Sequence, residues 1–266
     1  MLSYSGYRYY ISFIDAFSCF IWIFLLKHKS DALQTFSNFK TQVELQLGYK
    51  IKVIQTNWER EYRVFTNLLM SHGIIHRNSY PHTHEQNGVE KRKHRHIVEN
   101  DLILLAKASM PLKYWDETFR ATVFLYNKLP ISVFHWKTHL EVLFHSSLSY
   151  SMLRVSGCAC YPNTRPYNRH KLNFRSTKCT FLGYNLNHKV YKCLDKNDKI
   201  FISRDVIFYE HSFSFSSSNS LQTYLPSQAS NFSSIYGSSP LPPNFLSFSD
   251  GHLLNRSQTH VETHIG

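Results

Sequence analysis

The sequence has few cysteines, and none of them forms a CxxC pair. The five cysteines stand at positions 19, 158, 160, 179 and 193. An odd number without paired spacing argues against a disulfide framework, gives no zinc signature and predicts a reduced, intracellular protein. Cys158 and Cys160 stand two positions apart, so on a strand both side chains face one side. We interpret them as small buried residues, with a metal-binding pair as the alternative.

Long apolar runs are also missing. The apolar run at residues 20–26 is far too short to span a bilayer, which requires about 20 residues. Residues 5–8 are polar, and no secretory signal is visible. We therefore expect a nuclear or cytoplasmic protein without a signal peptide, a transmembrane segment or a membrane partner.

Acidic residues are scarce relative to basic ones. The chain of 266 residues has 18 Asp and Glu against 30 Lys and Arg, a net charge of +12. Such a balance favours an anionic partner, for which nucleic acid is one candidate and an acidic membrane surface another. A basic protein without such a partner is the alternative. The length is sufficient for one large domain or two small ones.

The first third of the chain has an α/β pattern. β-rich runs at residues 9–14 and 20–26 predict a hairpin of buried strands. Ser30 is expected to cap a helix that ends at Gly48, and a third strand follows at residues 51–56. A short helix at residues 65–71 and a strand at residues 74–76 complete the pattern.

Two helices and a β-rich segment are predicted next. The first helix spans residues 86–108, and the second begins at Pro111 and ends at Pro130, with a stripe that includes Trp115 and is expected to be core. Residues 153–210 predict short strands with basic loops. The loop cations are either a further DNA contact or simple surface, and they are Arg165, Arg169, His170, Lys171, Arg175 and Lys178.

Residues 211–266 contain 15 serines and only three charged residues, which predicts a disordered Ser/Pro-rich tail. The basic character therefore belongs to residues 1–210. We expect three regions: an α/β domain at 1–130, a helical connector with a small β-rich segment at 131–210, and the tail at 211–266.

Several stretches in the same order resemble the integrase core of Copia-type LTR retrotransposon Pol polyproteins, over about residues 6–210. They are YYISFIDAFS (9–18), IQTNWEREY (54–62), HGIIHR (72–77), QNGVEKRKHR (86–95), PLKYW (111–115), KCTFLGY (178–184) and ISRDVIF (202–208). The resemblance implies a ribonuclease H-like fold, DNA as the partner and a possible homo-oligomer as in integrases. It also implies that the first core strand lies upstream of Met1, which would leave a sheet edge exposed and give a low, broad thermal transition.

An active member of this family resembles a two-metal enzyme in which two aspartates and a glutamate hold Mg²⁺ or Mn²⁺ for phosphodiester transfer. By resemblance, the first aspartate lies upstream of Met1, and Asp15 is not that ligand. The second aspartate corresponds to Asn57, and the glutamate to Lys91, with Glu90 one residue early. Because an ammonium repels a divalent cation, we predict a degenerate copy with no intact catalytic residue, no cofactor and no bound metal.

Four differences from the family pattern can each arise from the same kind of nucleotide change. Asp to Asn at position 57, Gly to Glu at 59, Gly to Arg at 60 and Glu to Lys at 91 are each reachable by one G-to-A change in a codon. This common direction is typical of an unselected mobile-element copy.

The segment at residues 81–96 is the best candidate for nucleic-acid binding. A polar loop leads into a basic helix start, and several side chains can reach phosphates together. The residues predicted to bind are Gln86, Asn87, Lys91, Arg92, Lys93, His94 and Arg95. A solvated basic face is the alternative, and a histidine metal site at His82 and His84 is a further, unsupported one.

Three functions remain open from the sequence. The first is an inactive integrase-like remnant that binds nucleic acid, and the second is a working polynucleotidyl transferase that uses Glu90 or Glu61. The third is a host-adopted, non-enzymatic DNA-binding or interaction protein. Asn57 and Lys91 favour the first over the second, and nothing in the sequence separates the first from the third.

Overall fold

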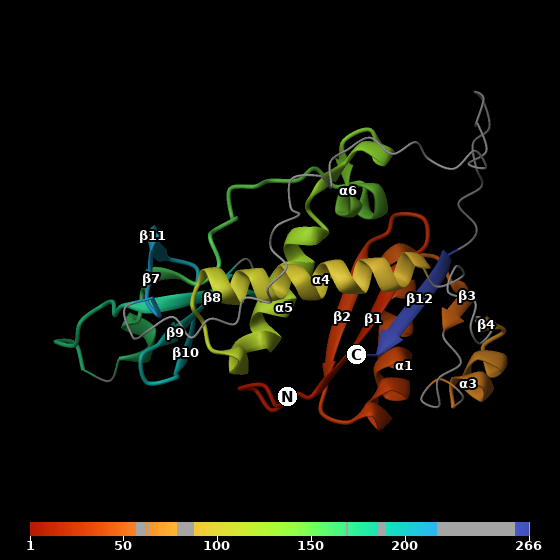
Figure 1. The fold of residues 1–266 in the computed structure, drawn as a ribbon, viewed down its shortest axis with the longest axis horizontal. Helices are drawn as coiled ribbons and strands as arrows, with labels where there is room; N and C mark the ends of the chain where they lie inside the picture. Colours follow the sequence, from red (N-terminus) through yellow and green to blue (C-terminus); the bar gives the residue numbers. More distant parts are fainter. Residues whose placement is uncertain are drawn as a thin grey trace, which may run out of the picture. The chain divides into compact units, whose positions relative to one another are not determined.

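The computed structural model describes residues 1–56, 62, 64–78, 88–168, 170–185, 190–216 and 259–265 (Figure 1). All of them belong to one compact unit formed by residues 1–217 and 257–266. The elements, in chain order, are β1 (Tyr9–Asp15), β2 (Ile21–Leu26), η1 (Lys29–Asp31), α1 (Ala32–Leu47), β3 (Ile51–Thr56), α3 (Phe65–Ser71), β4 (Ile75–Asn78), α4 (Gly88–Lys107), η2 (Leu112–Tyr114), α5 (Trp115–Tyr126), β5 (Pro130–Ile131), η3 (Ser132–Phe134), β6 (Lys137–Thr138), α6 (His139–Phe144), β7 (Cys158–Pro162), η4 (Arg165–Tyr167), β8 (Cys179–Asn185), β9 (Val190–Asp195), β10 (Ile200–Ser203), β11 (Val206–Phe213) and β12 (Thr259–Ile265).

The core sheet has five strands in the order β2-β1-β12-β3-β4. β1 pairs antiparallel with β2 and with β12, while β12, β3 and β4 run parallel to one another. Alternation along β1 sends its side chains to two different cores. Ile11 and Phe13 join the core that contains residues of α1 and α3, whereas Tyr10 and Ile14 join the core that contains residues of α4 and α5.

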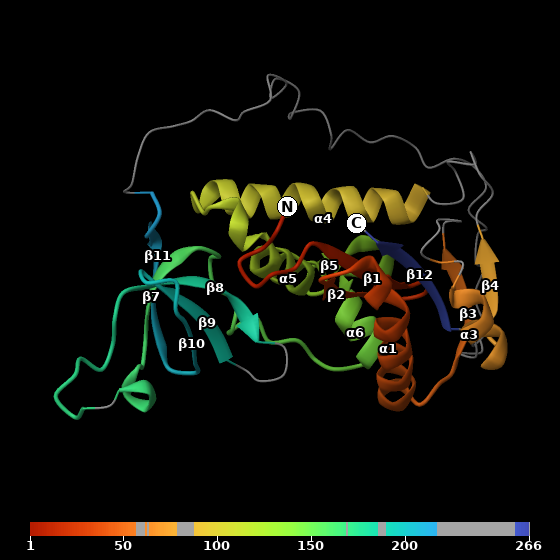
Figure 2. The same ribbon diagram turned by 90° about the horizontal axis from the view of Figure 1, so that it is seen from below.

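The helices therefore cover both faces of the sheet, with α1 on the opposite side from α4 and α5 (Figure 2). Three packed layers around a mixed sheet confirm the expected α/β class. The stripe on α5 is core as expected, because Phe119 and Val123 are buried and Trp115 packs beside them.

The first long helix ends as predicted but begins differently. Gly48 has a φ of 72° and its N–H donates to the carbonyl of Glu44 over 3.0 Å, as expected for a glycine C-cap. The expectation that Ser30 caps the helix is wrong. Lys29–Asp31 form a 3₁₀ turn, and the Asp31 carboxylate accepts from the backbone N–H of His28 over 3.0 Å.

The C-terminal end of the chain differs most from the expectation. Thr259–Ile265 is not part of a structureless tail but forms β12, which lies between β1 and β3. The predicted exposed edge on β1 is therefore wrong, because β1 is paired on both sides. A sequence pattern describes local periodicity and does not report which strand a distant segment joins.

The second sheet is the predicted small β-rich segment. Its order is β10-β9-β8-β7-β11, and every neighbouring pair is antiparallel. We call this sheet the barrel sheet. β11 extends to Phe213, three residues beyond the expected boundary at 210. Its core contains four buried free cysteines, which are Cys158, Cys160, Cys179 and Cys193.

These thiols behave as small apolar residues. Burial raises the pKa of the Cys158 thiol to about 12 and that of Cys179 to about 11, so both stay protonated at neutral pH. Within the described part of the chain, no group of three His, Cys, Asp or Glu side chains is arranged to hold a metal ion. The interpretation of Cys158 and Cys160 as small buried residues is confirmed.

Two close contacts join the barrel sheet to the helices of the core. The Lys192 ammonium lies 2.7 Å from the Glu117 carboxylate, with side chains only 15% and 9% exposed. At Gly157, which has a φ of 78°, a Cβ would lie 2.1 Å from the Cβ of Ala108. Glycine is required there both by its conformation and by the lack of space.

Residues 130–144 contain a hairpin that was not predicted and one helix of the predicted helical connector. β5 and β6 form a short hairpin that leads into α6. Thr138 and Glu141 form a capping box, in which Thr138 Oγ1 accepts from the N–H of Glu141 over 3.1 Å and Glu141 accepts from the N–H of Thr138 over 2.9 Å. A Thr followed three residues later by Glu is the signal that identifies this helix start in the sequence.

Candidate nucleic-acid interface

The first turns of α4 carry cations that point away from the protein. α4 is anchored by Ile97, which is buried in the same core as Tyr10. Lys91, Arg92 and Arg95 are exposed, and none of the ion pairs between described residues involves them. Since residues three and four positions apart share a helix face, Arg95 is a neighbour of both other cations.

His94 is separated from these cations. The Tyr10 hydroxyl lies 2.8 Å from Nδ1 and 2.9 Å from Nε2 of His94, and the two rings meet edge to face at 5.6 Å. Burial lowers the pKa of His94, so the ring is neutral at pH 7. His94 therefore contributes packing against β1 and no positive charge.

The other two basic residues of this run, Lys93 and His96, contact protein groups. Lys93 is half-buried, and its charge is one of the causes that lower the pKa of His139, after burial. His96 meets Tyr126 edge to face at 6.0 Å. Gln86 and Asn87 lie outside the described residues. Of the seven predicted binders, the structure thus brings Lys91, Arg92 and Arg95 together on one exposed face.

The metal-ligand positions inferred from the resemblance do not fit a two-metal site. Lys91 is exposed on α4 and presents an ammonium where a carboxylate is needed. Two unit charges 4 Å apart interact by about 4 kcal/mol at an effective dielectric near 20, so this sign change opposes a divalent cation. Asn57, Glu59, Arg60, Glu61, His82 and His84 lie outside the described residues.

Asp15 has a structural role. Its Oδ2 accepts from the backbone N–H of Ser18 over 2.7 Å and from the Ser18 hydroxyl over 2.6 Å. These bonds close the turn between β1 and β2, and the Asp15 side chain is buried. The Asp15 carboxylate therefore stabilises this turn.

A second basic surface lies on the loop after β7. Arg165, His170, Lys171, Arg175 and Lys178 are all exposed, whereas Arg169 lies outside the described residues. Leu172 and Phe174 on the same loop are 100% and 86% exposed. The loop is closed by a bond from the N–H of Thr164 to the carbonyl of Arg175 over 2.8 Å.

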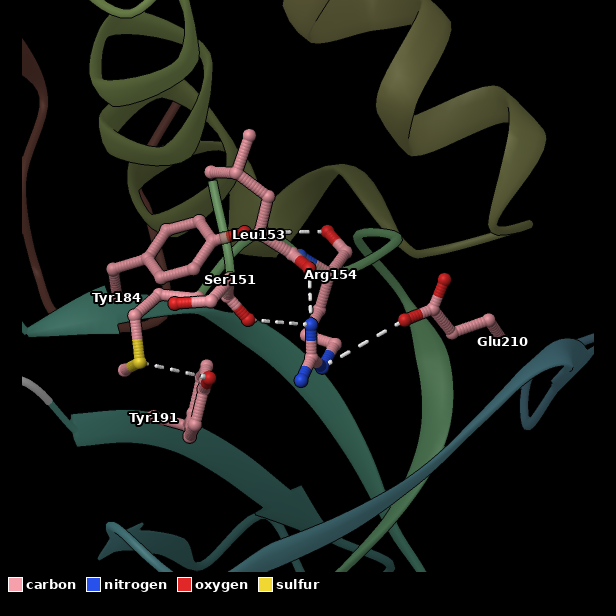
Figure 3. A network of polar contacts seen from close by, with 7 residues as sticks. Ser151, Leu153, Arg154, Tyr184, Tyr191 and Glu210 are labelled. Atoms are coloured by element: carbon pink, nitrogen blue, oxygen red, sulfur yellow. Dashed lines mark hydrogen bonds and ion pairs between the residues drawn. The ribbon is translucent and has the colours of Figure 1, made fainter. Parts of the chain in front are cut away.

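Other cations near the barrel sheet are held by protein groups. Figure 3 shows Arg154, whose guanidinium donates to the carbonyls of Ser151 and Leu153 over 2.9 and 2.6 Å and faces the Glu210 carboxylate at 3.7 Å. The Tyr184 hydroxyl accepts from the N–H of Arg154 over 2.8 Å. Arg154 therefore links the connector to the barrel sheet. The sequence does not indicate this role, because Glu210 is far away in sequence and the other partners are main-chain carbonyls.

No helix among the described residues is long and apolar enough to cross a membrane.

Comparison with known proteins identifies relatives of this chain. Residues 158–221 match the retroviral polymerase SH3-like domain. The chain is 43% identical over 229 residues to the retrovirus-related Pol polyprotein from transposon RE1 of Arabidopsis thaliana, a match that covers 86% of this chain. The chain belongs to the retrovirus-related Pol polyproteins of Copia-type transposons. The resemblance inferred from the sequence is confirmed.

Other Pol polyproteins show the same relation. The polyprotein from transposon RE2 of Arabidopsis thaliana is 43% identical over 82% of the chain, and that from transposon TNT 1-94 of Nicotiana tabacum is 34% identical over 78%. The chain spans only 15–16% of the length of these relatives. It therefore corresponds to one region of a Pol polyprotein.

Solved integrase structures resemble the fold more distantly. A simian T-cell lymphotropic virus intasome bound to PP2A regulatory subunit B56 gamma matches with a TM-score of 0.42 and 17% identity, over 74% of this chain and 70% of that chain. The HTLV-2 integrase catalytic core with magnesium matches with a TM-score of 0.38 and 22% identity, over 54% and 89%. The expected α/β class rests on the mixed core sheet and the helices that cover its two faces.

Proposed function

We propose that this Pol region binds the phosphate backbone of nucleic acid through the first turns of α4 and does not catalyse metal-dependent strand transfer. The observation that carries the proposal is the group of three exposed cations, Lys91, Arg92 and Arg95, on one helix face. Their charges are not compensated by any ion pair between described residues. A polyanion is the partner that compensates all three at once.

The position of the cations on the helix supports the same partner. Lys91 and Arg92 lie in the first turns of α4, where the helix dipole is positive. Cations at this end repel the dipole, at a cost of about 0.3–1 kcal/mol each at an exposed site. A bound phosphate reverses this cost, because it interacts favourably with both the side chains and the positive end of the helix dipole.

Salt-dependent binding to a duplex tests the first half of the proposal. Each phosphate that a cation neutralises contributes about 0.9 to the slope of log affinity against log salt. Three cations predict a negative slope with a magnitude of at least about 2.7 for a 30-base-pair duplex. Duplexes of unrelated sequence are expected to bind with similar affinities. A slope near zero, or a strong preference for one sequence, would contradict backbone binding.

A strand-transfer and endonuclease assay tests the second half. With Mg²⁺ or Mn²⁺ the natural chain is expected to give no cleaved or joined DNA, because Asn57 and Lys91 stand at the inferred ligand positions and a cation at 91 repels the metal. The matched comparison is the Asn57→Asp/Lys91→Glu double variant with the upstream strand, which by resemblance carries the first aspartate, restored. Metal-dependent products from the natural chain would overturn the proposed inactivity without affecting the binding half.

A further inference from the structure

The middle strand of the core sheet comes from the far end of the chain. β11 ends at Phe213, and the next described segment, Thr259–Ile265, forms β12. In β12, residues 261–265 pair antiparallel with residues 15–11 of β1. On its other side, β12 pairs parallel with β3, where Val261 lies opposite Ile54 and Glu262 lies opposite Gln55.

β1 and β3 do not pair with each other, so the sheet is continuous only through β12. Each of the two strands directs a row of backbone N–H and C=O groups at the gap between them, and one extended strand satisfies both rows. The side chains along the gap belong to the buried core, including Ile11, Phe13 and Ile54. The gap therefore has the backbone pairing and the apolar surroundings that bind an extended peptide.

We propose that the gap between β1 and β3 is a strand-binding site, and that Thr259–Ile265 of the same chain is its resident but exchangeable ligand. Recognition rests mainly on backbone hydrogen bonds on both sides, which a separate peptide can reproduce. The inference does not depend on nucleic-acid binding by α4.

The length of the intervening sequence determines how exchange is observed. Residues 217–258 have a contour length of roughly 140 Å, so the covalent connection does not confine the segment to the gap. A connection of this length gives an effective concentration of up to the order of millimolar. An added peptide at micromolar concentration therefore competes only when the resident strand is weakened.

The first experiment weakens the resident strand in the full chain. In Val261→Pro the strand loses a backbone N–H in the centre of the sheet, while the matched Val261→Thr keeps it. A labelled peptide of residues 257–266 is expected to bind Val261→Pro with micromolar affinity and to raise its Tm. The Val261→Thr and natural chains are expected to bind it at least 10-fold more weakly.

Two results would overturn the proposal. One is a Tm of Val261→Pro that does not change when the peptide of residues 257–266 is added. The other is equal binding of that peptide and of a scrambled peptide with the same composition. Because Val261→Pro can fail to fold, a cysteine pair in the full chain provides an independent readout. Ser12 lies opposite His264, so Ser12→Cys/His264→Cys is expected to form a disulfide under mild oxidation.

The matched control for the cysteine pair is out of register by one residue. Thr263 lies opposite Phe13, and neighbouring strand residues face opposite sides of a sheet, so Ser12→Cys/Thr263→Cys is expected to cross-link at least 10-fold less. Peptide mapping separates the new disulfide from reactions of Cys19. A cross-link that forms only between two molecules, or equal cross-linking by both pairs, would contradict occupancy of the gap by the same chain.

Discussion

The core sheet and the barrel sheet each contain five strands, but they are assembled in different ways. Every strand of the barrel sheet lies within residues 158–213, and all its pairs are antiparallel. The core sheet takes its middle strand from residues 259–265 and combines parallel with antiparallel pairs. The barrel sheet is thus built from local contacts, while the core sheet depends on one very distant contact.

The two sheets also differ in how their cations are used. Near the barrel sheet, Arg154 and Lys192 are held by carboxylates or carbonyls of the protein. On the helix that covers the core sheet, Lys91, Arg92 and Arg95 are exposed and have no ion pair among the described residues. Arg154 and Lys192 therefore hold the structure together, whereas the cations on α4 and on the loop after β7 are exposed.

The largest effect is expected from breaking the contact that joins the two regions. Lys192→Met leaves the Glu117 carboxylate buried without its partner, and we expect a loss of about 3 kcal/mol in the free energy of unfolding. Lys192→Met/Glu117→Leu is expected to recover most of this loss, because no charge remains buried. Denaturant unfolding of both variants measures the difference.

The matched control is Lys113→Met, which removes a pair with Asp198 whose side chains are 42% and 45% exposed. We expect a much smaller loss of stability there, because water screens an exposed ion pair. Equal losses from Lys192→Met and Lys113→Met would show that the contact between α5 and β9 does not hold the barrel sheet in place.

A somewhat smaller effect is expected from adding a Cβ at Gly157, which faces Ala108 just after the end of α4. Gly157→Ala combines a left-handed backbone with a Cβ 2.1 Å from that of Ala108, so we expect a loss of about 2–3 kcal/mol. Gly48→Ala has a similar φ of 72° and nothing within 4 Å, and is expected to cost only about 1 kcal/mol. Thermal unfolding of the two variants compares them directly.

Ala108→Gly provides the rescue for this prediction, because it removes the opposing Cβ. The Gly157→Ala/Ala108→Gly chain should lose less stability than the sum of the two single variants predicts. Strict additivity of the three free energies would contradict a direct steric contact.

A buried carboxyl group on α4 predicts a smaller, pH-dependent effect. Burial, opposed by a hydrogen bond from Thr118 and reinforced by the charge of Asp116, raises the pKa of Asp101 to about 7. Because this folded-state pKa lies above the unfolded value of 3.8, its contribution to stability is lost as the pH rises from about 4 to about 7. Asp101→Asn is expected to gain about 1–2 kcal/mol at pH 8 relative to the natural chain and almost nothing at about pH 3, below the unfolded pKa.

The quantity to measure is the difference in free energy of unfolding between Asp101→Asn and the natural chain as a function of pH. Burial lowers the pKa of His76, His94 and His139, which removes stability as the pH falls below 6.5 and so opposes the effect of Asp101. These histidines are present in both chains and cancel in the difference. A difference that does not change with pH would contradict the assignment to Asp101.

Much of the fold was predictable where the signal is local. Periodicity identified both strands of the first hairpin, the α1 helix with its Gly48 end, the core stripe of α5 and the short strands of the barrel sheet. β12 was not predictable, because Thr259–Ile265 follows a serine-rich stretch and its partners are more than 200 residues away. Its pairing depends on tertiary contacts that no window of the sequence contains.

The candidate site was predictable to a smaller extent. The basic run identified Lys91, Arg92 and Arg95, but its composition did not reveal that His94 faces Tyr10 or that Lys93 is half-buried. Helical spacing alone does not tell which face of a mixed polar run meets the protein. Likewise, the roles of Arg154 and Lys192 depend on Glu210 and Glu117, which are far from them in sequence.

The salt dependence of duplex binding is the most direct test of the exposed cations of α4 as the binding surface. Lys91→Ala/Arg92→Ala/Arg95→Ala is compared with Arg165→Ala/Lys171→Ala/Arg175→Ala, a barrel-loop variant with the same change in charge. The account predicts that the α4 variant lowers the magnitude of the salt slope by about 2–3, and that the loop variant lowers it less. An unchanged slope in the folded α4 variant, with a reduced slope in the loop variant, would contradict it.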